Sequence, residues 1–164
     1  MTISENGIRF IKLKESLHDG DLTIIGLQPK MCPAGIWTCG YGHAMIDPDT
    51  GKFLKGITNK DKAYHINTIN TEADADRTLR FDIKKFESIV NHKIRIQINQ
   101  SQFDALVSHT YNTGGSDTLF KLINERANPN IIRNWFESRY ITSAGKVLKG
   151  LINRRKQEAD MFFG

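Results

Sequence analysis

The sequence predicts an α+β protein that is mostly α-helical, in which a small irregular antiparallel β-sheet lobe is joined to a helical bundle by a long helix. Residues 18–57 are rich in Gly and Pro and hold only short β-prone runs, whereas apolar positions after residue 57 recur at helical spacing. The 164 residues are 39% hydrophobic and 25% charged, as in an ordinary globular chain. We therefore expect one domain over residues 1–164, with residues 1–17 and 58–164 forming its helical part.

The opening segment predicts a helix over residues 4–17 with Ser4 as its N-cap. Ile8 and Ile11 form an apolar stripe, and Glu15 continues that stripe four residues beyond Ile11. We expect a carboxyl at the end of an apolar stripe to be partly desolvated, which favours its protonated form. Glu15 is therefore a titratable group in an apolar setting.

The β lobe is predicted from short runs at 22–25, 35–41 and 53–57, with a tight turn at 47–51. The later helices are predicted from capping pairs and from glycine after a helix end. These pairs are Thr58 with Asp61, Thr71 with Asp74 and Asn99 with Gln102. The helix that begins at Asn99 is expected to end at Gly114. The long helix from Thr71 is expected to bridge sheet and bundle, and shorter helices are expected at 117–126, 130–140 and 149–162.

The composition limits the partners and cofactors. Net charge is +5, from 23 Lys and Arg against 18 Asp and Glu, so the surface attracts polyanions such as nucleic acid, anionic lipid or an acidic bacterial wall, unless the charge only confers solubility. The late basic cluster lacks interleaved aromatic residues, so no nucleic-acid binding is expected. No segment reaches the ~20 apolar residues of a membrane span, and no signal peptide is visible. The Cys and His spacings match no metal site, so neither a metal nor a cofactor is expected.

One motif carries chemistry. Residues 31–43 read MCPAGIWTCGYGH, with five residues between Cys32 and Thr38 and a Gly-Tyr-Gly-His run that ends at His43. This segment resembles the core motif of the phage-type lysozymes, or endolysins, of glycoside hydrolase family 24, in which Glu, eight residues, Asp or Cys, five residues and Thr follow one another. The upstream glutamate that fits is Glu15. Its gap to Cys32 is sixteen residues, so the segment after Leu17 holds an insertion of about eight.

Two further stretches resemble the same family, in the same order. Residues 102–108 and 111–114 match its central helix, and residues 150–159 match its C-terminal Gly-Leu-x-x-Arg-Arg block. The resemblance therefore covers essentially the whole chain and implies a lysozyme-like fold.

The resemblance implies a muramidase that cleaves the β-1,4 bond between N-acetylmuramic acid and N-acetylglucosamine in bacterial peptidoglycan. Such an endolysin would act as a monomer. It would fold in the host cytoplasm and reach the wall in the periplasm once released. The implied catalytic residues are Glu15, Cys32 and Thr38. The implied substrate-binding residues are Gly42, Asn112 and Arg154, of which Arg154 also pairs with the acid in the family. The implied role of His43 is architectural, through a pair with Asp82.

Cys32 leaves alternatives open, because many family members have aspartate at this position. A neutral thiol could orient water but could not stabilise positive charge on the sugar. Asp19 or Asp21, in the insertion, could supply the second carboxylate instead, or Cys32 could be an unreactive buried residue. The corresponding alternatives for function are a catalytically inactive wall-binding protein and, with less support, a thiol hydrolase that uses Cys39 or Cys32 with His43.

Overall fold

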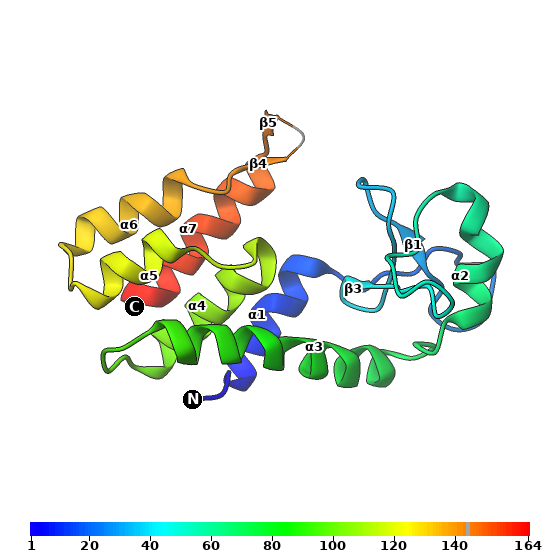
Figure 1. The fold of residues 1–164 in the computed structure, drawn as a ribbon, viewed down its shortest axis with the longest axis horizontal. Helices are drawn as coiled ribbons and strands as arrows, with labels where there is room; N and C mark the ends of the chain where they lie inside the picture. Colours follow the sequence, from blue (N-terminus) through cyan, green and yellow to red (C-terminus); the bar gives the residue numbers. More distant parts are fainter. Residues whose placement is uncertain (144) are drawn as a thin grey trace. The chain divides into compact units, whose positions relative to one another are not determined.

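The computed structural model describes residues 1–143 and 145–164, and it divides the chain into two compact units. The helical unit comprises Met1–Lys14 and Ile83–Gly164, and the sheet unit comprises Glu15–Asp82 (Figure 1). The sheet unit is longer than the β lobe expected at 18–57. It extends to Asp82 because α2 and the first part of α3 pack with the sheet rather than with the bundle.

The helical unit is built around α4. Eight successive residues of this helix, from Phe103 to Thr110, are buried, so it is covered on every side. Its neighbour α7 packs along it, and α6 packs on α7 (Figure 1). The helices of the chain are α1 (Glu5–Glu15), α2 (Lys60–Ile66), α3 (Glu72–Lys93), α4 (Gln100–Thr113), α5 (Asp117–Asn124), α6 (Pro129–Ser138) and α7 (Lys149–Phe163).

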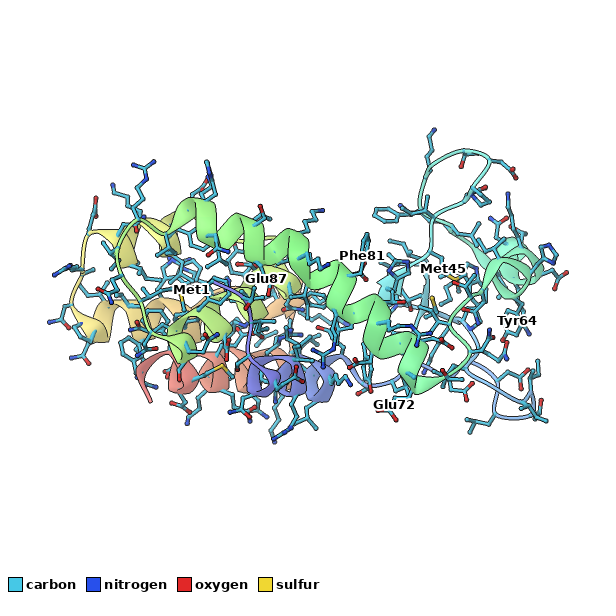
Figure 2. All side chains as sticks on the ribbon, turned by 90° about the horizontal axis from the view of Figure 1, so that it is seen from below. Met1, Met45, Tyr64, Glu72, Phe81 and Glu87 are labelled. Carbon is cyan, nitrogen blue, oxygen red and sulfur yellow. The ribbon has the colours of Figure 1, made fainter. Side chains whose placement is uncertain are left out.

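Hydrogen bonds at the N-terminus fix the start of α1. Ser4 caps the helix as predicted, because its hydroxyl accepts a hydrogen bond from the backbone N–H of Gly7 at 3.2 Å. The backbone N–H of Ser4 donates to Asp104 Oδ1 at 2.9 Å. The backbone N–H of Ile3 donates to Glu87 on α3, and Figure 2 shows Glu87 close to the start of the chain. The first helix is thereby held against α3 and α4.

Two of the other predicted caps are confirmed and one is wrong. Thr71 and Asp74 exchange side-chain to backbone hydrogen bonds at the start of α3, and Asn99 and Gln102 do so at the start of α4. The pair of Thr58 with Asp61 does not cap α2. A short 3-10 turn, Ile57–Asn59, occupies that position, and α2 begins after it at Lys60.

The sheet unit holds three short antiparallel strands in the order β1-β2-β3, namely β1 (Lys30–Met31), β2 (Trp37–Cys39) and β3 (His43–Ala44). Trp37 packs edge-on against Tyr64 of α2, with ring centroids 6.2 Å apart, and Met45 is buried in the same unit (Figure 2). The core of this unit therefore lies between the sheet and α2.

The predicted β-run at 22–25 is wrong. These residues form turns, and Leu22 and Ile25 are 87% and 102% exposed. The carboxylate of Asp21 accepts hydrogen bonds from the backbone N–H and the hydroxyl of Thr23, so a local turn replaces a strand ladder. The run at 53–57 contributes only isolated bridges, Ile46 with Phe53 and Ile36 with Lys55.

A second, unpredicted hairpin lies in the helical unit, between β4 (Thr142–Ser143) and β5 (Lys146–Val147). Strands of two residues are too short for the alternation that reveals a strand in a sequence. Among the residues that the structure describes, no helix has both the length and the apolar character needed to cross a membrane.

Candidate active site

The first group of candidate residues lies within the sheet unit, around Glu15. Glu15 is the last residue of α1, two residues earlier than the predicted helix end. Ser16 then takes a left-handed conformation, with φ of 61°, which turns the chain away from the helix axis. Two residues later the backbone N–H of His18 donates to the carbonyl of Gly40 at 2.8 Å. This bond ties the end of α1 to the residue that follows β2.

Glu15 faces the glycine-rich turn of the motif. A Cβ atom placed on Gly42 would lie 3.5 Å from Glu15 Oε2. Gly42 also has a φ of 84°, which side chains other than that of glycine rarely adopt. Glycine therefore keeps the space beside the carboxylate open. The structure thus brings Glu15 and Gly42 together, as expected if both contact one substrate.

Thr38 lies in the centre of β2, opposite Lys30 of β1, and is 6% exposed. Its hydroxyl donates to the carbonyl of Lys30 at 2.9 Å. The same Oγ1 atom lies 2.9 Å from Nδ1 of His18. The hydroxyl is therefore held on two sides before any substrate arrives.

His18 is the residue of this group that the sequence did not predict. Burial and the charge of Lys30 lower the pKa of His18, while the carboxylate of Glu15 and its backbone carbonyl raise it less strongly. His18 lies three residues after Glu15, but its partner Thr38 is twenty residues further along the chain, beyond an irregular insertion. No local pattern links the two residues.

Cys32 begins the turn that joins β1 to β2. Its backbone N–H donates to the carbonyl of Ile36, and its carbonyl accepts from the N–H of Gly35, both at 2.8 Å. The first of these bonds extends the pairing of the two strands, so side chains 32 and 38 fall on the same face of the ribbon. Cys32 is half-buried, and its thiol is free.

The two aspartates of the insertion stabilise the loop in which they lie. Asp19 Oδ1 accepts from the backbone N–H groups of Asp21 and Gln28, both at 3.3 Å. Hydrogen bonds from Thr23 lower the pKa of Asp21. The neck of the loop is closed by Gly20, whose N–H donates to the carbonyl of Gln28. A Cβ on Gly20 would lie only 2.0 Å from the carbonyl oxygen of Pro29, so this position requires glycine.

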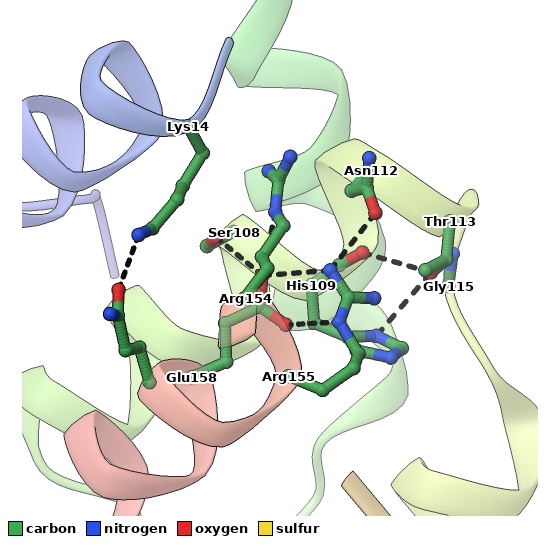
Figure 3. Close-up of polar contacts among 10 residues, drawn as sticks. Lys14, Ser108, His109, Asn112, Thr113, Gly115, Arg154, Arg155 and Glu158 are labelled. Atoms are coloured by element: carbon green, nitrogen blue, oxygen red, sulfur yellow. Dashed lines mark hydrogen bonds and ion pairs between the residues drawn. The ribbon is translucent and has the colours of Figure 1, made fainter. Parts of the chain in front are cut away.

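The second group of candidate residues lies in the helical unit, around a fully buried carboxylate (Figure 3). Arg154 Nε and Ser108 Oγ donate to Glu158 Oε1 at 3.1 Å and 2.8 Å. Arg155 Nε lies 3.0 Å from Glu158 Oε2, and its Nη2 donates to Asn112 Oδ1 at 2.9 Å. Burial raises the pKa of Glu158, and the two guanidinium groups oppose this effect.

This cluster orients both predicted substrate-binding residues of the unit. Arg154 is held by Glu158 one helical turn away, and the amide of Asn112 is held by Arg155. Glu158 and Arg155 were not predicted as site residues, although their signal was present: acid and base three and four residues apart share one face of a helix.

His43 and Asp82 form the predicted pair, with Nδ1 and Oδ2 2.7 Å apart. Cys39 is buried beside this pair. Burial, with a smaller contribution from Asp82, raises the pKa of its thiol to about 12. A thiol with this pKa is not a nucleophile near neutral pH, which argues against a thiol hydrolase based on Cys39. Among the residues that the structure describes, no group of three or more His, Cys, Asp and Glu side chains could hold a metal ion.

A carboxylate at the end of the first helix, facing a Gly-rich turn of a small sheet, is typical of lysozyme-like folds. A profile of the phage lysozyme family matches residues 25–158. The endolysin of Bacillus phage B103 is 32% identical over 99% of this chain, which spans 54% of that relative's length. The endolysin of Acyrthosiphon pisum secondary endosymbiont phage 1 is 29% identical, and the match covers 99% of this chain and 98% of that relative.

A solved structure agrees with these sequence relatives. The endolysin of Escherichia coli O157:H7 phage FAHEc1 has a TM-score of 0.73 to this structure at 32% identity, with 99% of this chain and 93% of that chain covered. The chain therefore belongs to the phage lysozyme family. The predicted resemblance and the mostly helical α+β fold are both confirmed.

Proposed function

We propose that this chain is an endolysin that hydrolyses the β-1,4 glycosidic bond between N-acetylmuramic acid and N-acetylglucosamine in peptidoglycan. The observation that carries the proposal is the position of Glu15, the last residue of α1. Its carboxylate faces Gly42 and lies beside His18. Glycoside hydrolysis needs an acid that protonates the leaving oxygen and a second group that places or replaces the attacking water. Glu15 supplies the acid in this proposal.

The remaining roles follow from the chemistry. The proton of Glu15 passes to the leaving glycosidic oxygen as the bond to the anomeric carbon breaks. The oxygen of a water molecule bonds to the anomeric carbon and releases its proton to solvent. Thr38 and Cys32, on one face of the β1–β2 ribbon, hold that water. Gly42 admits the sugar close to the backbone, and the exposed amide of Asn112 binds saccharide. Arg154, whose guanidinium is buried, supports this region through its hydrogen bond to Glu158.

The substrate and the place of action belong to the same proposal. Peptidoglycan is an anionic polymer, which suits a chain of net charge +5. We propose that the protein folds in the host cytoplasm, acts as a monomer without metal or cofactor, and reaches the wall in the periplasm once it is released.

The direct test is the identity of the reducing end that is formed. Purified protein is incubated with purified sacculi, the soluble products are reduced with borohydride, and their masses are measured. Reduced muramic acid at the new end is the expected result, and reduced glucosamine would overturn the assignment of the bond. Binding to sacculi without release of soluble products would favour the inactive wall-binding protein instead.

Glu15→Gln is the matched variant for this assay, because it keeps the shape of the side chain but cannot supply the proton. We expect its thermal unfolding to match that of the parent and its lytic rate to fall by at least a thousandfold, on the order of 4 kcal/mol. Activity within tenfold of the parent would contradict the role of Glu15 as the acid.

A further inference from the structure

The hydroxyl of Thr38 has one hydrogen and two polar neighbours at 2.9 Å. One neighbour is the backbone carbonyl of Lys30, which can only accept a hydrogen bond. The other is Nδ1 of His18, which can donate or accept according to its tautomer. Because the single hydrogen of the hydroxyl cannot serve two acceptors, these neighbours cannot both accept.

Only one placement of the hydrogens gives the Thr38 hydroxyl a hydrogen bond with both neighbours. Thr38 donates to Lys30, and His18 carries a hydrogen on Nδ1 and donates it to Thr38 Oγ1. In the opposite tautomer the hydroxyl could donate to only one of the two acceptors, so either the Lys30 carbonyl or Nδ1 would face Oγ1 at 2.9 Å without a hydrogen between them. A fixed hydrogen bond at one ring nitrogen determines which nitrogen of a neutral imidazole carries the proton.

The surroundings of His18 hold the ring in this position. Its backbone N–H is bound to the carbonyl of Gly40 at 2.8 Å, so the residue is anchored at the end of β2. The ring is half-buried, and it lies near enough to the charges of Glu15 and Lys30 for both to act on it. The hydroxyl of Thr38 is thus bonded on two sides, and one lone pair of its oxygen remains to accept a third hydrogen bond.

We propose that His18 is a positioning residue of the glycosidase site, which acts through Thr38 by donating from Nδ1 and leaving one lone pair of Oγ1 to accept a hydrogen of the attacking water. The proposal rests on the proposed function. It assigns a role to a residue of the insertion. The neighbouring position 32 holds a thiol, whereas many members of the family have aspartate there, which is a stronger hydrogen-bond acceptor. Thr38 then carries a larger share of the work of holding water.

The test compares two variants of similar shape. The amide N–H of His18→Asn can take the place of Nδ1–H, whereas His18→Leu has nearly the same volume and no donor. We expect His18→Leu to lower kcat about tenfold with KM within twofold, and His18→Asn to recover activity to within about threefold of the parent. A fully active His18→Leu protein, or an Asn variant as impaired as the Leu variant, would overturn the proposal.

A double-mutant cycle shows whether His18 acts through Thr38. Thr38→Val removes the hydroxyl, so His18→Leu should cost less than twofold in that background if the hydroxyl is what His18 orients. If the two losses multiply, His18 only supports the loop and the proposal fails. This outcome is distinct from a failure of the proposed function, in which the unsubstituted protein itself would release no muropeptides.

The tautomer can also be measured without any activity. The ¹⁵N chemical shifts of the His18 ring in the unsubstituted protein, recorded at a pH at which the ring is neutral, distinguish a protonated from an unprotonated Nδ1. A protonated Nδ1 is the expected result. A ring protonated on Nε2 alone would overturn the proposal even if every variant behaved as expected.

Discussion

Nδ1 of His43 lies 2.7 Å from Oδ2 of Asp82, and this contact joins β3 to α3 within the sheet unit. The hydrogen bond that Nδ1 of His43 donates to Asp82 raises the pKa of His43, and burial opposes this effect. His109 lies in the opposite environment. Its side chain is 0% exposed among the rings of Trp135, Phe136 and Tyr140, and burial, followed by the charges of Arg155 and Arg154, lowers its pKa to about 3.

The pair of His43 with Asp82 should stabilise the folded protein at acidic pH. Because the folded pKa of His43 lies above its unfolded value, this stabilisation is complete below about pH 6.5 and is lost as the pH rises through the folded pKa. Asp82→Asn should therefore lower Tm at pH 5.5 and leave it unchanged at pH 9. The pair is partly exposed, so we expect a loss of only about 1–3 °C. An equal loss of Tm at pH 5.5 and at pH 9, measured by circular dichroism, would contradict this origin of the stabilisation.

His109 should destabilise the folded protein at acidic pH. Its folded pKa lies below the unfolded value, so the unfolded chain binds the proton more tightly and stability falls as the pH drops from about 6.5 towards 3. The full effect is on the order of 5 kcal/mol. His109→Phe suits the aromatic surroundings and should flatten the fall in unfolding free energy between pH 6.5 and 4. His92→Phe, at an exposed position of α3, is the matched control and should leave the slope unchanged.

These contacts show which features a sequence can predict. The caps at Ser4, Thr71 and Asn99 were predicted correctly because each is a bond between residues three apart, which short-range chemistry determines. The pair of His43 with Asp82 was predicted from the family resemblance. The contact of His18 with Thr38 was not predictable, because it depends on how an irregular insertion folds back on β2. The run at 22–25 was misassigned because β-propensity ignores the local bonds that Asp21 makes.

Glu158 should be among the residues on which stability depends most. It is fully buried and pairs with two buried guanidinium groups, so its loss would remove a negative charge that both cations share. Glu158→Gln keeps the shape and should cost about 3–5 kcal/mol, or on the order of 10 °C in Tm. Glu125→Gln, which affects an exposed pair with Lys121 at 3.8 Å, should change Tm by less than about 2 °C. Similar effects of the two variants would mean that the buried cluster contributes little.

The insertion carboxylates should be dispensable for turnover. Asp19 and Asp21 both accept hydrogen bonds within their own loop. Asp19→Asn and Asp21→Asn should therefore keep the lytic rate within about threefold, with at most a small loss of stability. Loss of turnover in a protein with unchanged circular dichroism would instead identify a replacement carboxylate in the insertion, and the role assigned to Cys32 would then be wrong.

Cys32 should need a compact polar group more than a particular atom. If it holds water beside the sugar, Cys32→Asp should keep substantial activity, because a carboxylate is the commoner group at this place in the family. Cys32→Ala should lose at least tenfold in kcat/KM, on the order of 1.4 kcal/mol of transition-state stabilisation.

Alkylation gives an independent test on the unsubstituted protein. Cys39 is buried, and its pKa is raised to about 12, so a thiol reagent near neutral pH should modify Cys32 first. Inactivation should then follow the modification of Cys32 measured by mass spectrometry, and a chitooligosaccharide should slow both processes, because the thiol would face the bound sugar. A Cys32→Ala protein that lyses cells at the parental rate would show that the thiol only fills space. In that case Thr38, oriented by His18, would hold the water alone.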